Sequence, residues 1–366
     1  MTNFRVPYID LRAEFNELRD GLVDDLISIG EDARFILREE VQLFETTAAD
    51  YLGAGYAIGV GSGTDALMLA LLALDIGPGD EVITVGHTFV ATISVIANLG
   101  ATPILIDIQD DFNLDPNLLE AAITDATKVV MVVHMNGRCC DMTTIQELCK
   151  QHGLELIEDA AQAFGSRYQG QAAGTFGDFG CFSFHPMKIL HCFGDGGMVT
   201  TNDAELADKI RLLRNHGQRT KNEIVMYGVN SRLDNLQAAF LLRMISRLDA
   251  EIQRRREIAH RYNQGLDGIT NITCPPIDGD GYFDVFSSYV MRVSNRDALR
   301  RHLQEKGVEV FSHWEVANHR QTALGLNGFA LPNTERISNE VLSLPIHGQL
   351  SNDQVDYVIE VIRHAE

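Results

Sequence analysis

The chain has 366 residues, of which 45% are hydrophobic and 22% charged, and its formal net charge is −21. This length suits one large domain with a smaller one, and the composition is ordinary for a soluble globular protein. The acidic balance argues against nonspecific nucleic-acid binding, which needs a basic surface. No apolar run approaches the ~20 residues needed to span a membrane.

The N-terminus and the cysteines bear on the compartment of the protein. The start, MTNFRVPYIDLRAEF, has no basic stretch and no apolar core, so it is not a secretion signal. The six cysteines show no C-x-x-C pair and no disulfide-framework spacing, so we expect reduced thiols in a cytoplasmic protein. His185, His191 and Cys192 lie close together, but without a second ligand cluster they do not predict a metal site.

Short apolar strands alternate with helical stretches between residues 55 and 205. This alternation is typical of an α/β domain with a mainly parallel sheet. We expect strands at 81–85, 103–107, 129–133, 154–159, 181–184 and 197–201, and helices at 64–75 and 142–153.

The remaining chain predicts a connector and a smaller domain. A helical pattern with few Gly or Pro breaks runs from about Leu233 to Tyr262. After a turn-rich stretch we expect a strand at 286–293, a helix at 296–307, a strand at 308–314 and a last helix at 351–365. The sequence therefore predicts a large α/β domain over residues 1–250 and a small α+β domain over 251–366.

The stretch GVGSGTDAL, residues 59–67, is rich in glycine and opens an apolar helix. The free N–H groups and positive dipole end of such a helix start bind phosphate. The alternative is a tight turn with Ser62 or Thr64 as the helix cap. After the next strand, Phe89 is either a core residue or a platform that stacks on a ring.

The stretch LELIEDAAQAFGS, residues 154–166, ends a buried strand in two adjacent carboxylates, Glu158 and Asp159. Open α/β sheets bind ligands at the carboxyl ends of their strands. For either carboxylate the alternative is a helix cap. The small residues that follow, Ala160 and Ala161, would let a flat ligand approach the backbone.

Lys188 lies within the stretch FSFHPMKILHCFGDGG, residues 182–197. A lysine in a loop is usually solvated. Here Ser183, His185 and Pro186 precede it, and the glycines that follow permit tight backbone packing. A lysine in a partly desolvated site loses proton affinity and becomes an amine nucleophile that forms Schiff bases.

Together these segments supply the parts that a pyridoxal phosphate (PLP) site requires. The glycine-rich helix start could hold a phosphate, and Phe89 could cover a ring. Asp159 could pair with a pyridinium nitrogen, and Lys188 could form an imine.

Seven motifs resemble, in order, those of the DegT-type nucleotide-sugar aminotransferases: GSGTDAL, TFVAT, EDAAQAFGS, FSFHPMK, GDGGMVTTND, RNHGQ and GVNSRLDNLQAA. These are fold-type I PLP enzymes of the aspartate aminotransferase superfamily, which aminate keto groups of nucleotide-linked sugars. The resemblance runs from about residue 5 to the C-terminus. It implies a large domain with a mainly parallel, mixed seven-stranded sheet flanked by helices, and a smaller α+β domain.

The resemblance implies a role for each matching residue. Lys188 corresponds to the lysine that forms the Schiff base with PLP, and Asp159 to the partner of the pyridine nitrogen. Gln162 would lie beside the ring hydroxyl and Phe89 would stack on the ring. The implied phosphate ligands are Ser62, Gly63, Thr64 and Ser183.

Two further residues carry implied roles. His185 would lie next to the catalytic lysine. Asn230, in GVNSR, resembles the asparagine that reaches the phosphate from the neighbouring subunit. The resemblance therefore implies a homodimer with shared sites.

The implied reaction is amino transfer from glutamate to C3 or C4 of a nucleotide-linked ketosugar, for a surface polysaccharide or glycolipid. Lys188 would act as general base and then acid. Two alternatives within the fold are a dehydratase, which replaces the lysine by histidine, and a PLP-binding regulatory protein. A nicotinamide-dependent enzyme is disfavoured because the G-x-G-x-x-G motif is missing.

Two segments depart from the family pattern. HMNGRCCDM, at 134–142, has Asn136 and Arg138 where the family often has an aromatic residue and Gly-Gln. SHWEVANHRQ, at 312–321, keeps an aromatic residue in Trp314 and a histidine in His319 but lacks the prolines. We expect both segments to face the sugar nucleotide. Arg138 would pair with a phosphate or carboxylate, or would be a simple exposed arginine.

Overall fold

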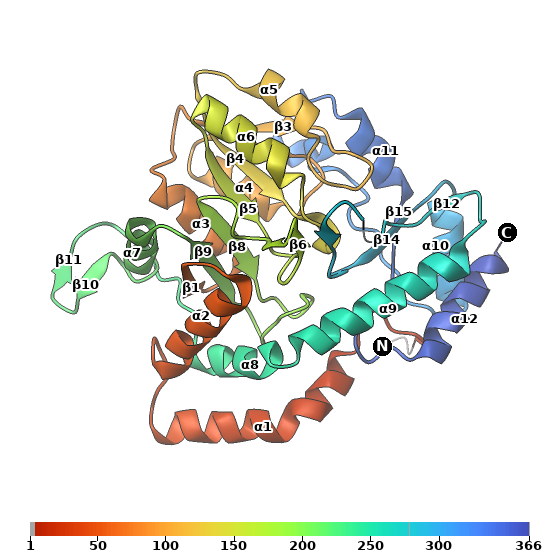
Figure 1. Cartoon of the computed structure of the whole chain (residues 1–366), viewed down its shortest axis with the longest axis horizontal. Helices are drawn as coiled ribbons and strands as arrows, with labels where there is room; N and C mark the ends of the chain where they lie inside the picture. Colours follow the sequence, from red (N-terminus) through yellow and green to blue (C-terminus); the bar gives the residue numbers. More distant parts are fainter. Residues whose placement is uncertain (1–3, 278, 366) are drawn as a thin grey trace.

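The computed structural model describes residues 4–277 and 279–365. A seven-stranded sheet forms its centre (Figure 1). In spatial order the strands are β1 (Tyr56–Val60), β9 (Gly197–Thr201), β8 (Phe179–Ser183), β5 (Glu155–Asp159), β4 (Thr127–Val133), β2 (Glu81–Val85) and β3 (Thr102–Ile106).

Strand direction places the chemistry at one edge of this sheet. β9 runs antiparallel to both of its neighbours, and the other pairs are parallel. Six strands therefore point the same way, and their carboxyl ends share one edge. Since ligands bind at this edge in open α/β sheets, the segments that follow β1, β2, β5 and β8 are brought together there.

Helices cover the sheet because parallel strands need crossover connections. Figure 1 shows α1 and α8 lying side by side below the sheet, with α2 next to α8. A short hairpin, β10 (Gln218–Thr220) and β11 (Glu223–Ile224), projects from the body at the left of the view. The helices of this part are α1 (Leu11–Glu31), α2 (Glu39–Leu52), α3 (Gly63–Ala73), α4 (Ala91–Asn98), α5 (Leu119–Ala122), α6 (Met142–His152), α7 (Ala204–Leu213), α8 (Asn235–Ile245) and α9 (Leu248–Leu266).

The C-terminal part is built on an antiparallel sheet in the order β12 (Ile272–Thr273), β14 (Tyr289–Val293) and β15 (Val341–Leu344). Its helices are α10 (Arg296–Glu305), α11 (Pro332–Glu340) and α12 (Asn352–Arg363), and α9 packs on α12. A third small sheet joins β13 (Tyr282–Phe283), β6 (Arg167–Tyr168) and β7 (Gln171–Ala172). The 3-10 helices are Pro116–Leu118, Met135–Gly137, Asn318–Arg320 and Thr322–Leu324.

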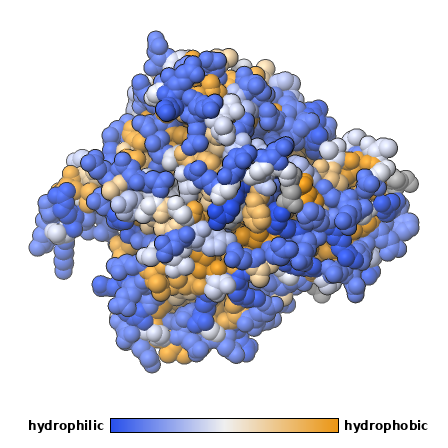
Figure 2. Space-filling view, in the orientation of Figure 1, coloured by the Kyte–Doolittle hydropathy of each residue, from blue (hydrophilic) through white to orange (hydrophobic). Residues whose placement is uncertain are grey.

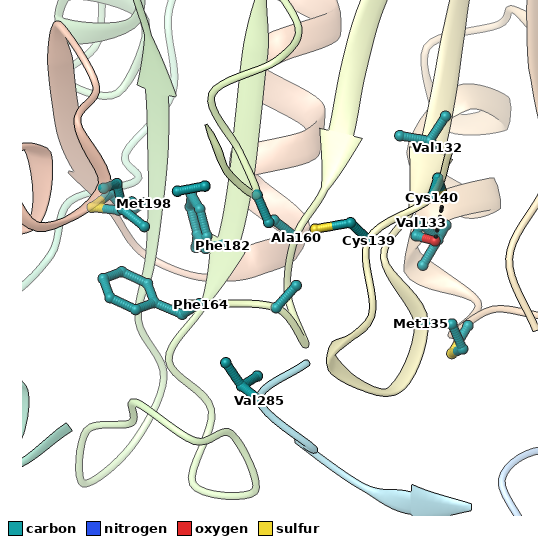
Figure 3. Packing of buried hydrophobic residues seen from close by; sticks show 14 of the residues in the cluster. Val132, Val133, Met135, Cys139, Cys140, Ala160, Phe164, Phe182, Met198 and Val285 are labelled. Carbon is teal, nitrogen blue, oxygen red and sulfur yellow. Dashed lines mark hydrogen bonds between the residues drawn. The ribbon is translucent and has the colours of Figure 1, made fainter. Parts of the chain in front are cut away.

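The apolar runs of the sequence form separate buried clusters. In one large cluster, the rings of Phe164 and Phe182 lie 5.3 Å apart between centroids, beside Met198 (Figure 3). Val285, from the C-terminal half of the chain, points into the same cluster. A second cluster contains Val6 together with residues of α9, β14, β15 and α12. The division of the chain near residue 250 stays a prediction.

Two predicted elements are wrong. The helical pattern at 233–262 forms two helices, α8 and α9, with a break at Ser246 and Arg247; the Ser246 hydroxyl donates to the Arg243 carbonyl at 2.7 Å. The segment 308–314 is not a strand, because it makes only isolated bridges, Val308 with Val6 and Phe311 with Ser343. Within the described ranges, no helix combines the length and hydropathy needed to cross a bilayer.

Candidate functional site

A cavity of about 210 Å³ lies at the carboxyl edge of the central sheet. Three of the residues predicted from motifs line it, namely Phe89, Gln162 and Lys188. Trp314 lines it as expected for a residue that faces substrate. The other lining residues are Tyr8, Ile9, Asn136, Met187, Arg255, Ser287, Ser288, His313 and Ile346.

Lys188 sits in a turn that follows β8, where its N–H donates to the His185 carbonyl at 2.8 Å. Its side chain is only partly exposed. Burial lowers the pKa of the Lys188 amine from its usual 10.5, and the negative charge of Asp159 opposes this shift. The amine is therefore neutral, and nucleophilic, at a lower pH than a solvated lysine.

Asp159 ends β5 with its side chain buried. The Thr92 hydroxyl donates to Oδ2 at 2.8 Å, and the Ala161 N–H donates to Oδ1 at 3.2 Å. Burial raises the pKa of the Asp159 carboxyl, whereas Thr92, Ala161 and the charge of Lys188 lower it. A buried carboxylate with one donor on each oxygen keeps lone pairs for a further cationic or N–H partner.

Glu158, the adjacent carboxylate, points to the other face of β5 and is fully buried. Its Oε1 accepts from the N–H groups of Phe176 (2.7 Å) and Gly177 (2.8 Å). Its Oε2 accepts from Gly174 N–H (2.7 Å) and lies 2.8 Å from His134 Nε2. Glu158 therefore holds the loop before β8, and Asp159 alone is available at the site.

The start of α3 lies against the end of β8. Ser62 caps α3, because its Oγ accepts from the Asp65 N–H at 3.1 Å. A Cβ on Gly63 would stand 2.6 Å from the Cβ of Ser183, so only glycine allows this approach. Thr64 is exposed. The first N–H groups of a helix lack helical partners. The Ser62 cap satisfies one of them, that of Asp65, so the cap does not exclude anion binding by the others.

The remaining predicted residues surround this edge. Phe89 is 55% exposed, with its ring centroid 6.4 Å from that of Trp314. Gln162 Oε1 accepts from the Asn136 N–H at 3.0 Å. His185 is exposed, and its Nδ1 accepts from the Met187 N–H at 3.2 Å. Partial burial, and then the charge of Lys188, lower the pKa of His185.

Asn230 is exposed and lies next to the start of α3 of its own chain. It forms an isolated bridge with Asn215. The hydroxyl of the following residue, Ser231, donates to Asp65 Oδ2 at 2.8 Å and accepts from the Gly61 N–H at 3.0 Å. Asn230 is therefore on the surface beside the helix start that the motifs assign to phosphate.

Comparison with known proteins identifies the family. Residues 18–363 match the model of the DegT/DnrJ/EryC1/StrS aminotransferase family. This chain belongs to that family. The dTDP-3-amino-3,6-dideoxy-alpha-D-galactopyranose transaminase of Aneurinibacillus thermoaerophilus is 42% identical over 98% of both chains. The pleiotropic regulatory protein of Geobacillus stearothermophilus is 40% identical over 98% of this chain and 97% of its own.

Solved structures agree on fold and cofactor. DesV of S. venezuelae, in complex with a ketimine intermediate, superposes with a TM-score of 0.95 at 41% identity over 99% of both chains. Other solved structures of similar fold hold PMP or are PLP forms. The protein is a PLP-dependent aminotransferase of fold type I, so the predicted family, fold class, enzyme class and cofactor are confirmed.

The residues of this aminotransferase fit PLP. Lys188 lines the cavity with a partly buried amine, Asp159 is a buried carboxylate at the end of β5, and the charge of each acts on the pKa of the other. The close approach of Gly63 to Ser183 brings the Ser183 side chain to the start of α3, where free N–H groups can bind a phosphate. Among the described residues, no group of His, Cys, Asp or Glu could hold a metal ion.

Arg138 and His319 have other roles in the aminotransferase than sequence suggested. Arg138 Nη1 donates to Asp284 at 2.6 Å, and its guanidinium stacks 3.7 Å from the Tyr282 ring centroid. It is therefore neither exposed nor free to bind a substrate phosphate. His319 is fully buried and lies 3.2 Å from Glu335, outside the residues that line the cavity.

Sequence analysis missed several cavity residues of the aminotransferase. Tyr8 and Arg255 come from the N-terminal segment and from α9, and neither lies in one of the seven motifs. Arg255 Nε donates to Glu251 at 2.6 Å, and its Nη1 donates to the carbonyls of Phe286 and Ser287. The sequence shows only an arginine within a helical pattern. Its burial, which would mark it as unusual, depends on tertiary contacts.

Proposed function

We propose that this aminotransferase moves an amino group from glutamate to the keto group at C3 or C4 of a nucleotide-linked sugar. The observation that carries the proposal is that Lys188 lines the cavity while the buried Asp159 lies near enough for its charge to raise the pKa of Lys188, in a chain whose relatives include a dTDP-aminosugar transaminase. The proposed role is aminosugar biosynthesis for a surface polysaccharide or glycolipid, in the cytoplasm.

PLP supplies an electron sink when bound. Lys188 Nζ would hold the cofactor, Asp159 would keep a proton on the ring nitrogen, and Phe89 would stack on the ring. Gln162 would lie beside the ring hydroxyl. The phosphate would be held by Ser62, Gly63, Thr64 and Ser183.

Lys188 also moves the protons of the reaction. Its free Nζ would take a proton from the α-carbon of the amino donor and would return one to the sugar carbon. The lowered pKa of Lys188 suits this exchange, because more of the amine is neutral, and able to take a proton, than for a solvated lysine at the same pH. His185, which is exposed and accepts from the Lys188 N–H through its carbonyl, is proposed as an auxiliary catalytic residue.

The surface supports a homodimer. Figure 2 shows hydrophobic residues gathered over α2 and α8, on the lower half of the view. Exposed apolar side chains also lie on α1 and on the β10–β11 hairpin and the residues after it. A large exposed apolar patch marks an interaction site. The exposed residues are Val23, Leu26, Ile27, Phe35, Leu43, Ile224, Val225 and Tyr227.

We place Asn230 at the phosphate of the neighbouring subunit in this dimer. Complementation tests this. K188A and N230A chains are co-expressed and purified as mixed dimers. In a purified mixed dimer one of the two sites keeps both Lys188 and Asn230, so activity should return to about half of wild type. No recovery in demonstrably mixed dimers would mean that Asn230 serves its own subunit.

The direct test of function is 2-oxoglutarate release. The PLP-loaded protein is incubated with glutamate, first alone and then with a panel of nucleotide ketosugars. Glutamate alone should give one equivalent of 2-oxoglutarate, and the correct sugar should give many. The Lys188→Ala variant should give none. Visible cofactor absorbance without any 2-oxoglutarate would instead support a regulatory protein, as the name of the Geobacillus relative suggests.

A further inference from the structure

His191 links the backbone of Lys188 to helix α1. Its side chain is buried, with 4% of the residue exposed. The ring Nδ1 lies 2.9 Å from the carbonyl oxygen of Lys188. The ring Nε2 lies 3.0 Å from Oε2 of Glu14, which belongs to α1 and is itself mostly buried. No motif or role discussed above accounts for this arrangement.

The contact with Lys188 fixes the role of one ring nitrogen of His191. A backbone carbonyl only accepts hydrogen bonds, so Nδ1 must donate to Lys188. The other nitrogen, Nε2, faces the Glu14 carboxylate at 3.0 Å, within ion-pair distance but without the geometry of a hydrogen bond. The bond from Nδ1 is therefore the directional contact that His191 makes.

Neighbouring contacts hold the same loop to the helices below it. The Phe193 N–H and carbonyl both bond to the side-chain amide of Gln237, at 3.0 Å each. The Phe193 ring also meets Phe15 of α1 edge-on, at 5.8 Å between centroids. These contacts anchor the loop at Phe193, five residues after Lys188, whereas His191 reaches the carbonyl of Lys188 itself.

We infer that His191 is a positioning residue for Lys188: its Nδ1–H fixes the carbonyl of the lysine that exchanges protons in the amino transfer. The inference rests on the proposed function. Lys188 must leave and regain its bond to the cofactor in each cycle, so its backbone must stay fixed while its side chain moves. Misplacement of a catalytic group by about 1 Å can cost ~100-fold in rate.

Two amide substitutions separate positioning from packing. Asparagine places its amide nitrogen where Nδ1 stands, so His191→Asn keeps the donor to Lys188 and loses the Glu14 contact. Glutamine places its amide nitrogen where Nε2 stands, so His191→Gln keeps the Glu14 contact and loses the donor. His191→Leu loses both. The matched control is His152→Leu, which removes a surface histidine that lies 3.5 Å from Glu120.

The expected result is a difference in kcat. We expect His191→Leu and His191→Gln to lower kcat by about 10- to 100-fold with little change in KM, and His191→Asn to stay within about threefold of wild type. His152→Leu should match wild type. If His191→Gln is as active as His191→Asn, or if both match wild type, the inference is wrong.

Two readouts do not depend on turnover. PLP titration of the apo variants, followed by cofactor absorbance, should show weaker capture by His191→Gln than by His191→Asn. Thermal unfolding of the apo variants should not follow that order, because Glu14 is retained as a partner only in His191→Gln. If affinity and unfolding temperature fall together, His191 has a packing role only. If wild type binds PLP but releases no 2-oxoglutarate, the proposed function fails while this comparison still stands.

Discussion

Replacing Glu158 by glutamine tests whether the two adjacent carboxylates have different roles, Glu158 in stability and Asp159 in amino transfer. Each Glu158 oxygen has two donors, from three backbone N–H groups and from His134. The Cys140 N–H donates to His134 Nδ1 at 3.1 Å, so the ring proton must be on Nε2, facing Glu158. Glutamine offers only one accepting oxygen, and in either orientation its NH₂ group faces two donors.

The magnitude follows from this count. The substitution removes two hydrogen bonds to a buried charged group, each worth about 1.5–3 kcal/mol, so the free energy of unfolding should fall by about 3–6 kcal/mol. An unfolding entropy of about 2.1 cal/mol/K per residue converts this into a decrease of roughly 4–8 °C in the unfolding temperature.

The matched control is Asp159→Asn. Each Asp159 oxygen has a single donor, and the Thr92 hydroxyl can reverse to accept from the new NH₂ group. We expect its unfolding temperature to stay near wild type while amino transfer falls steeply. Differential scanning fluorimetry of the apo proteins, paired with the 2-oxoglutarate assay, measures both effects. Equal unfolding temperatures for the two variants would refute the separation of roles.

Three further outcomes are expected. Thr92→Val removes a hydrogen-bond donor that lowers the pKa of Asp159, so this pKa should rise. The acidic limb of the pH–kcat profile should then move to higher pH by about 1–2 units. An unmoved limb would count against Asp159 as the charged partner of the ring nitrogen. Arg138→Met removes one buried ion pair, that of Arg138 with Asp284, and should cost about 3 kcal/mol in urea unfolding with an unchanged KM for the sugar; the reverse pattern would make Arg138 a substrate ligand. Because burial lowers the pKa of Lys188 from 10.5, cyanoborohydride trapping of PLP on apo protein should reach half its maximum below that pH; a midpoint at or above it would contradict the burial.

The sheet edge could be predicted because its signals are local. Each strand before a site residue is a short apolar run bounded by turn residues, and strands of this kind form one parallel sheet. Asp159, Lys188 and the α3 start then fall at the same edge by topology alone. The break between α8 and α9 could not be predicted, because Ser246 and Arg247 carry no Gly or Pro signal.

The rest of the cavity depends on contacts between distant parts of the chain. Tyr8 N–H donates to Glu309 at 2.9 Å, and Val6 N–H donates to Gly307 at 3.0 Å, which draws the N-terminal segment onto the C-terminal part. The same pairing affects the segment 308–314, which we expected to be a strand. It forms only two isolated bridges, one from Val308 to Val6 and one from Phe311 to Ser343. No periodicity within either segment encodes such a pairing.

The residues at the sheet edge and the residues of segment 312–321 differ in how far substitution would disturb the fold. Asp159 is held by the register of β5 with β8 and by its hydrogen bond from Thr92, and Lys188 by the turn that follows β8, so a backbone change there would disturb the edge of the central sheet. His313 and Trp314 lie in an irregular segment and line the cavity from the opposite side. Residues there can change without disturbing the register of the central sheet. The departures from the family pattern at 312–321 are therefore where a new sugar specificity would arise with the least cost to amino transfer.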